Sequence, residues 1–375
     1  MNDIENKNIK NIIDFYMLVN SLKNIKINGN KTVTEQIYGA MVLANAINSE
    51  YNIVSDEEFG TVLKKILIDE IYNMYGIEIV NKIYDEDNLG VYNLFKFSQY
   101  CNPDEYGSDT SDFAFRCSYL ECILNNFFEV LLKELEIKTD DMDMIYEVAK
   151  KYGITSHLGD DETKNYEIFR FYYLNRNLSN KERTGWDDEH WNIDKAKRET
   201  VASHIVGTIA LSLAISAELD INLNIDEVIK TLSIHELGEI EIGDKTPYDG
   251  MTPEVKRELE RKAFIKILGN LTKNKEMLQR FDDFEERITI EDIFAYYCDK
   301  LEADIQSKIY YDLGLHHPLT EQENNVAMKS KRIKEIIASG AENAFDLWYE
   351  YDKPIYQDNE VFTKTLKYVK DNKIK

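Results

Sequence analysis

The chain has 375 residues, of which 43% are hydrophobic and 30% are charged, a balance typical of a folded globular protein rather than a disordered one. Its 45 basic and 69 acidic side chains give a net charge of −24, which repels a nucleic-acid backbone or an anionic membrane and argues against a duplex-binding role. A small anionic substrate held at a metal ion is compatible with this charge, because the ion sets the local field.

The cysteines and the N-terminus indicate a cytoplasmic protein. Cys101, Cys117, Cys122 and Cys298 form no CxxC pair and no dense framework, so we expect free thiols in a reducing cytosol. The N-terminus carries charges where a signal peptide needs an apolar run. No stretch approaches ~18 uninterrupted apolar residues, so we expect no membrane segment.

Residues 1–155 are predicted to form a helical region that carries no chemical motif. Apolar side chains recur at helical spacing from Ile37 to Ile47 and from Phe59 to Tyr75, and Thr34 and Ser111 are candidate N-caps. Aromatic side chains at this spacing are typical of a packed core rather than a cofactor site. The role of the region is unknown: packing on the second half of the chain and a contact between copies in a homo-oligomer both stay open.

The stretch 153–161 (GITSHLGDD) is the best candidate for a linker. It divides the chain into the N-terminal helical region, 1–155, and a second domain, 160–375, which holds the informative residues. A helix is expected over 199–219, where His204 lies within an apolar face, one turn from the start.

A further helix is expected over 225–244, with an apolar face that runs from Val228 to Ile240. His235 and Glu239 are four residues apart and therefore share one side of this helix. Glu236 follows His235 about 100° round the helix axis, so the adjacent pair could reach one ion from two directions.

Four carboxylates, those of Glu236, Glu239, Glu241 and Asp244, accompany His235 in this segment. A lone buried histidine usually bonds to a backbone or carboxylate group, but so many carboxylates are costly to gather unless a cation sits among them. Imidazole and carboxylate ligands together favour Mn, Fe, Co, Ni or Zn over Ca. For Glu241 a solvated position is the simpler interpretation. The sequence HELGE also resembles the zinc-protease motif HExxH, but it lacks the second histidine, which argues against a metalloprotease.

A third helix is expected over 289–313, with Asp299 in its middle among tyrosines and apolar residues. A carboxylate in such surroundings needs a partner, and a salt bridge is the simple explanation when this residue is taken alone. For the neighbouring Lys300 we expect a salt bridge to Glu302 or Asp304.

His in one helix, His-acid in the next and Asp in a later one give the order H…HD…D, and this part of the chain resembles the HD-domain phosphohydrolases. Within them it is most similar to the group of small 5′-deoxynucleotidases. Four stretches carry the resemblance: RTGW (183–186), ETVASHIVGTIA (199–210), HELGEIEIGDKTP (235–247) and AYYCDKLEADIQ (295–306). They match, in turn, the opening arginine and tryptophan of that group, its E-x-V-x-x-H helix, its HDxxExxxGDxxP stretch and its D-K/Q-L/C-E core.

The resemblance implies an all-α fold, an HD-domain helical bundle with the additional N-terminal helical region. It also implies a divalent metal ion as cofactor (Mn, Co, Fe, Ni, Zn or Mg), held by His204, His235, Glu236 and Asp299. It gives four further residues a role: Glu239 orients or activates the attacking water, Asp244 handles the sugar or the leaving group, Arg183 contacts phosphate, and Trp186 forms a pocket wall.

Glu236 departs from the pattern of the group, which has aspartate as its second acidic ligand. Glutamate keeps the charge and adds a methylene. It could ligate through a shifted helix or a different oxygen, or it could mark a changed metal or a lost activity, and the sequence leaves these alternatives open.

The function expected from the resemblance is that of a metal-dependent phosphoric monoester hydrolase acting on a nucleoside 5′-monophosphate. Its partner would be a small nucleotide substrate, with neither duplex nucleic acid nor a membrane. One alternative is a non-catalytic module that senses metal or nucleotide through an altered site. Another is an HD hydrolase of a different nucleotide, such as an alarmone, a dNTP or a cyclic dinucleotide.

Overall fold

The computed structural model describes residues 3–27, 31–83, 89–95, 98, 107–219 and 221–374. Within these residues the regular structure is helical, accompanied by two isolated β-bridges, and the all-α expectation is confirmed. Cys117, Cys122 and Cys298 are free thiols, whereas Cys101 lies outside the described residues.

The N-terminal part of the chain forms helices that the apolar spacing largely predicts. In chain order they are α1 (Asp3–Ser21), the short 3₁₀ helix η1 (Leu22–Asn24), α2 (Val33–Tyr51), α3 (Asp56–Ile83), α4 (Leu89–Leu94), α5 (Asp109–Asn126), α6 (Leu132–Glu134), α7 (Met142–Lys151) and α8 (Glu162–Asn180).

The remaining helices carry the site and the C-terminal end of the chain. They are α9 (Val201–Leu219), α10 (Ile225–Leu232), α11 (Glu239–Ile242), α12 (Pro253–Leu268), α13 (Asn274–Glu286), α14 (Ile290–Asp312), α15 (Lys331–Ala338), α16 (Ala344–Asp352) and α17 (Glu360–Asp371). The helices α9 and α14 correspond to those expected over 199–219 and 289–313.

Two predicted N-caps are wrong by two or three residues. Thr32, not Thr34, caps α2, because its side chain accepts from the N–H of Glu35 while the Glu35 carboxylate accepts from the Thr32 N–H at 2.7 Å. Ser108, not Ser111, caps α5. Ser111 is instead buried inside the first turn of α5.

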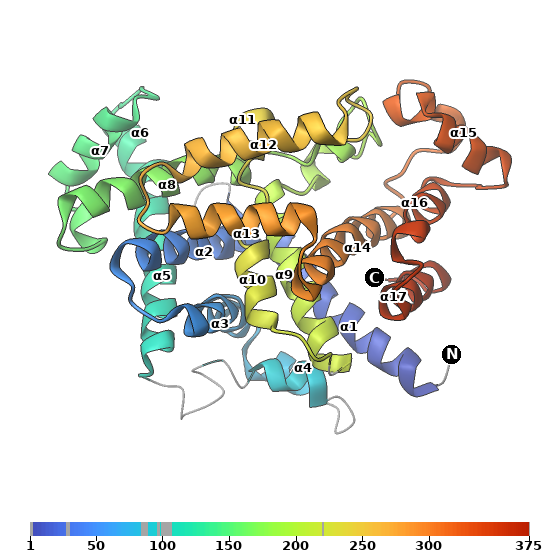
Figure 1. Cartoon of the computed structure of the whole chain (residues 1–375), viewed down its shortest axis with the longest axis horizontal. Helices are drawn as coiled ribbons and strands as arrows, with labels where there is room; N and C mark the ends of the chain where they lie inside the picture. The colour runs from blue at the N-terminus through green and yellow to red at the C-terminus, as the bar shows by residue number, and fades with distance from the viewer. Residues whose placement is uncertain are drawn as a thin grey trace.

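The helix α9 lies at the centre of the molecule, next to α10 (Figure 1). The helices α1, α2, α4, α10 and α14 all pack against it, which explains why its side chains are buried almost all the way round. Its length and apolar composition would also suit a helix that crosses a membrane, but 83% of the relevant stretch is buried inside the molecule, as in a core helix.

One hydrophobic core joins the N-terminal helices to the rest, running from Ile9 in α1 to Ile374 at the C-terminal end. The segment expected as a linker lies between α7 and α8: Gly153 follows α7 with a φ of +73°, and Asp161 caps α8. The predicted regions 1–155 and 160–375 therefore share a core rather than each closing one of its own.

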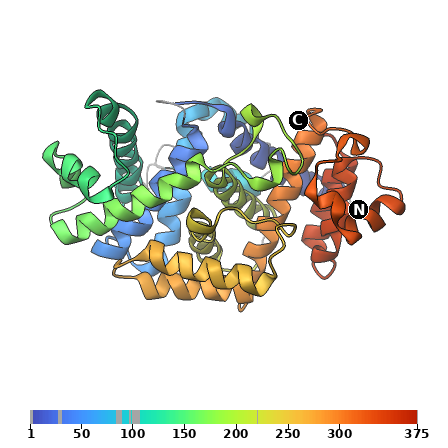
Figure 2. The same ribbon diagram turned by 90° about the horizontal axis from the view of Figure 1, so that it is seen from above.

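Two further groups of helices flank this core. The helices α12 and α13 run side by side along one edge of the molecule, seen most clearly in Figure 2. A smaller apolar cluster lies towards the C-terminal helices and contains seven buried residues: Trp186, Trp191, Ile193, Tyr310, Ile333, Ala344 and Leu347. We call these seven residues the tryptophan cluster.

Candidate metal centre

Four side chains that the sequence marks as ligands meet inside the fold. His204 comes from α9, Asp299 from α14, and His235 and Glu236 from the turn between α10 and α11. Each offers one nitrogen or oxygen atom, and these four atoms all lie within 4.8 Å of one another.

The spacing of these atoms suits a single ion. Asp299 Oδ1 lies 2.9 Å from His204 Nε2 and 3.7 Å from His235 Nε2. Glu236 Oε1 lies 3.8 Å and 3.6 Å from the same two nitrogens. Ligands that bind one ion at about 2.1 Å can be at most about 4.2 Å apart, so these four nitrogen–oxygen pairs fit.

The helix expected over 225–244 is interrupted at the site, and this correction explains how His235 and Glu236 reach it. The chain leaves α10 at Leu232 and becomes helical again at Glu239. In a continuous helix the Leu232 carbonyl would accept from the Glu236 N–H. Here the ring Nδ1 of His235 donates to that carbonyl at 2.8 Å. The backbone tightens accordingly, with the Glu239 N–H donating to the Glu236 carbonyl at 3.0 Å.

The ring of His235 is the strongest sign of a metal ligand. Its Nδ1–H is donated to the Leu232 carbonyl, so in the neutral ring Nε2 carries the lone pair. This Nε2 is buried and has no hydrogen-bond partner among the described residues. A buried imidazole nitrogen is normally paired. A buried nitrogen whose lone pair is unused and which faces two carboxylates is arranged to bind a cation.

His204 is held from behind by a buried carboxylate. Its Nδ1 donates to Glu302 Oε2 at 2.6 Å, and its Nε2 faces Asp299. Burial and Arg183 lower the pKa of His204, but Glu302 and Asp299 outweigh them and raise that pKa to about 9. A proton therefore bridges His204 and Asp299 when no ion is bound. A bound cation would displace it while Nδ1–H stays on Glu302.

Glu302 was missed as a functional residue from the sequence alone. It stands three residues after Asp299 in the matched stretch AYYCDKLEADIQ, which puts both on one face of α14 and is the signal that could have found it. The salt bridge expected for Lys300 is also wrong in its partner. Lys300 pairs with Asp299 Oδ2 at 2.8 Å, because Glu302 faces the core and bonds to His204.

Glu239 and Asp244 lie beside the ligands. Glu239 is buried, and its Oε2 has no hydrogen-bond partner in the described structure. Burial and the charges of Asp244 and Glu236 raise the pKa of Glu239 well above its usual range. Asp244 is fixed by the Thr184 N–H, which donates to its Oδ2 at 2.7 Å.

Arg183 joins these acids to the ligand set. Its Nη1 lies 3.2 Å from Glu236 Oε1 and 3.6 Å from Asp244 Oδ1. Burial raises the pKa of Glu236, but His235 and Arg183 more than reverse this and lower that pKa to about 2. Glu236 is therefore ionised and suited to a cation.

Trp186 does not line this cluster. It is 2% exposed, its indole N–H donates to Glu199 Oε1 at 3.1 Å, and its ring stacks on Trp348 at a centroid distance of 5.1 Å. The structure places it inside the tryptophan cluster.

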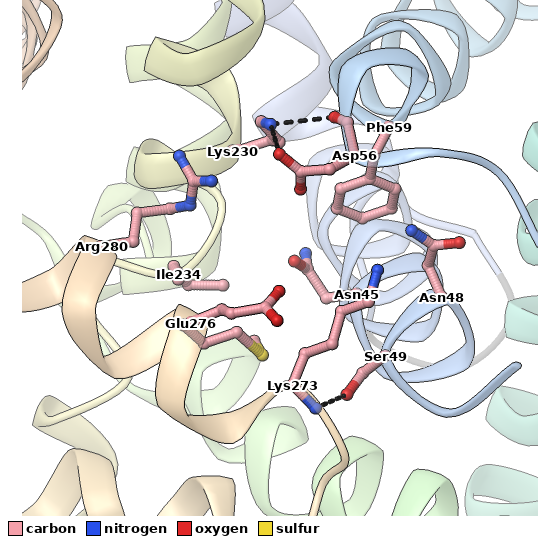
Figure 3. A pocket seen from close by; sticks show the side chains of 11 residues that line it. Asn45, Asn48, Ser49, Asp56, Phe59, Lys230, Ile234, Lys273, Glu276 and Arg280 are labelled. Carbon is pink, nitrogen blue, oxygen red and sulfur yellow. Dashed lines mark hydrogen bonds and ion pairs between the residues drawn. The ribbon is translucent and has the colours of Figure 1, made fainter. Parts of the chain in front are cut away.

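A separate pocket of about 180 Å³ lies between α2, the start of α3, α10 and α13 (Figure 3). Two of its cationic side chains are paired: Lys230 with Asp56 at 2.7 Å, and Arg280 with Glu227, which is not part of the lining. The pocket borders Ile234, the residue before His235, but includes none of the four ligand residues.

Comparison with known proteins agrees with this geometry. Residues 176–344 match the family model described as "HD domain". Proteins named 5′-deoxynucleotidase HDDC2 are similar: that of Dictyostelium discoideum is 28% identical over 147 residues (37% of this chain, 75% of the relative), and that of Mus musculus is 28% identical over 148 residues (39% and 71%). The human protein is 27% identical over 153 residues (40% and 71%). The chain thus contains an HD domain with distant similarity to these proteins, and the expected resemblance is confirmed.

Proposed function

We propose that the protein is a metal-dependent phosphohydrolase that removes phosphate from a nucleoside 5′-monophosphate. The observation that carries the proposal is the unpaired, buried Nε2 of His235, which faces Asp299 and Glu236 beside His204. The HD domain supports the reaction class, and the names of the relatives support the substrate class.

The donor set fits a divalent transition metal or Mg²⁺. Two imidazole nitrogens and two carboxylates suit Mn, Fe, Co, Ni or Zn better than Ca. When bound, such an ion lowers the pKa of a water molecule and polarises a phosphoryl oxygen. The nucleophile and the charge stabilisation for phosphate hydrolysis would therefore both arise next to His204 and His235.

The surrounding side chains have complementary tasks in this proposal. Arg183 lies next to Glu236 and Asp244, where its remaining N–H groups can grip a phosphate. Glu239, whose pKa is raised by burial and by the charges of Asp244 and Glu236, can accept a proton and so orient or activate the attacking water. Asp244, fixed by Thr184, can accept from a sugar hydroxyl or handle the leaving group.

The test is phosphate release from a panel of deoxy- and ribonucleoside monophosphates with added Mn²⁺ or Co²⁺. The His235→Ala variant removes the unpaired nitrogen. His316→Ala is a matched control, because His316 bonds to Ser307 and does not belong to the four-residue cluster. We expect release by the wild type and the control, and none by His235→Ala.

Absence of release from every monophosphate, with metal bound and the fold intact, would contradict the proposal. It would favour a non-catalytic sensor or a hydrolase of another nucleotide. The arrangement of Glu236 supports a complete metal site, because its oxygen reaches the cluster despite the longer side chain.

A further inference from the structure

Two residues of the N-terminal region lie directly behind the metal centre. Tyr16 belongs to α1 and Lys23 to η1, and both side chains are buried. The Tyr16 hydroxyl donates to Glu302 Oε1 at 2.6 Å, and Lys23 Nζ donates to the same oxygen at 2.9 Å. The other oxygen of Glu302 accepts from His204. One carboxylate thus connects a segment near residue 20 to a candidate ligand.

The ammonium group of Lys23 has a complete set of acceptors. Besides Glu302, it donates to Glu199 Oε2 at 2.5 Å and to Gln306 Oε1 at 3.1 Å. An ammonium group has three N–H donors, so all of them are used inside the protein. Glu199, His204 and Glu302 offer a second group of closely spaced donor atoms. Lys23 supplies the positive charge that balances the carboxylates of Glu199 and Glu302 in this second group.

The carboxylate of Glu302 is fixed sterically as well. It is 0% exposed, and a Cβ placed on Gly207 of α9 would lie 2.5 Å from Glu302 Oε1. The absent side chain at position 207 therefore makes room for this oxygen. With Tyr16 and Lys23 on one oxygen and His204 on the other, the carboxylate has little freedom to rotate.

We propose that Tyr16 and Lys23 are positioning residues of the metal centre. They hold the Glu302 carboxylate in one orientation, and Glu302 in turn keeps His204 in the tautomer and ring orientation that present Nε2 to the ion. The inference rests on the proposed function, because it assumes that the cluster binds a divalent metal. Both residues lie outside the 176–344 segment that matches the HD domain. The N-terminal region would therefore contribute to metal binding by orienting one of the ligands.

The experiment uses the full chain with three single substitutions. Lys23→Met keeps much of the side-chain volume and removes the charge, and Tyr16→Phe removes only the hydroxyl. Lys31→Met is the matched control, since Lys31 is also buried in the N-terminal region and pairs with Glu121, which belongs to neither donor group. The measurements are the Mn²⁺ dissociation constant by calorimetry, the thermal unfolding midpoint, and the ring N–H resonance of His204 in the metal-free protein, assigned by its loss in His204→Gln.

We expect Lys23→Met to weaken Mn²⁺ binding about 10- to 100-fold and Tyr16→Phe to weaken it several-fold, as for other groups that orient metal ligands. Both variants should shift or broaden the His204 resonance. Lys31→Met should lower the unfolding midpoint while leaving the resonance and the Mn²⁺ affinity close to those of the wild type.

Wild-type Mn²⁺ affinity together with an unchanged His204 resonance in Tyr16→Phe and Lys23→Met would overturn the inference. If Lys23→Met does not fold, Tyr16→Phe decides by the same criteria. If the wild type binds no Mn²⁺, the proposed function fails separately, and the resonance of the metal-free variants still decides whether these residues orient His204.

Discussion

At the scale of single residues, Glu236 is the position where the chain departs from the pattern it resembles. Its Oε1 lies 3.6 Å from His235 Nε2 and 3.2 Å from Arg183 Nη1. The residue lies in the turn between α10 and α11, and from there its longer side chain reaches the two histidines. The carboxylate thus faces the place where an ion would bind.

Shortening Glu236 to aspartate should preserve or raise phosphohydrolase activity, because the shorter acid keeps the charge at a ligand position. Glu236→Gln should lose most metal binding, since an amide is a weaker ligand and cannot balance the cation. Metal content and phosphate release of the two purified variants check this. A well-folded Glu236→Asp protein that holds no metal and has no activity would count against Glu236 as a ligand.

The proton on His204 predicts a pH dependence of the metal-free protein. The pKa of this group rises from an unfolded value near 6.5 to about 9. Its contribution to stability is therefore fully present below about pH 6.5 and is lost as the pH rises through 9. The loss is about 3–4 kcal/mol at most, at about 1.4 kcal/mol per pH unit between 6.5 and 9. Urea unfolding of metal-free protein at pH 6.5 and 9.5 measures it.

His204→Gln is the control for this pH effect, because glutamine cannot take up the proton. The difference in unfolding free energy between the two pH values should shrink markedly in this variant. Equal differences in the wild type and in His204→Gln would show that His204 carries no such proton.

At the scale of elements, the turn between α10 and α11 shows what periodicity can and cannot predict. The apolar spacing correctly predicts α9 and α14, both of which are largely buried. The same spacing continues through residues 233–238, where the chain is not helical. The competing contact is a side-chain bond from His235 to Leu232, which apolar spacing does not register.

Gly238 fixes the place of this turn against α12. A Cβ at position 238 would lie 3.0 Å from the Cα, Cβ and carbonyl oxygen of Glu260, so the backbone of α12 would have to move. Gly238→Ala should therefore destabilise the protein by about 1–3 kcal/mol and weaken metal binding through His235. Gly185→Ala is the control, because no atom lies within 4 Å of its added Cβ. Equal urea midpoints for the two variants would refute the packing argument.

The four candidate ligands could be predicted from the sequence, whereas the residues that hold them in place could not. His204, His235, Glu236 and Asp299 stand in a recognisable order, so their meeting in space could be predicted. Glu302 and Lys23 are linked only by a buried charge pair between residues 279 positions apart. No local sequence pattern predicts such a pair, because the two residues come together only once α1 has packed against α9.

At the scale of the whole molecule, the shared core bears on the predicted division at residues 153–161. The helices α1, α2 and α4 pack on α9, and one hydrophobic cluster runs through both parts. Composition and a Gly-containing stretch can suggest a linker, but they do not reveal which apolar faces cover one another.

We expect the chain to unfold in a single transition, because neither part can expose its share of the core independently. All three tryptophans, Trp186, Trp191 and Trp348, lie in or against the tryptophan cluster, so their fluorescence reports the C-terminal part. Far-ultraviolet circular dichroism reports every helix. The two urea curves should coincide. A fluorescence transition clearly separated from the loss of helix would show that residues 1–155 and 160–375 unfold as independent units.

The most direct test of the metal centre is the metal content of protein loaded with Mn²⁺ or Co²⁺ and freed of excess ion. Element analysis by mass spectrometry would compare the wild type, His235→Ala and His316→Ala. The account predicts one ion per chain in the wild type and in His316→Ala, and none in His235→Ala at unchanged helical content. A wild type without bound ion, or a His235→Ala protein that retains a full equivalent, would contradict it.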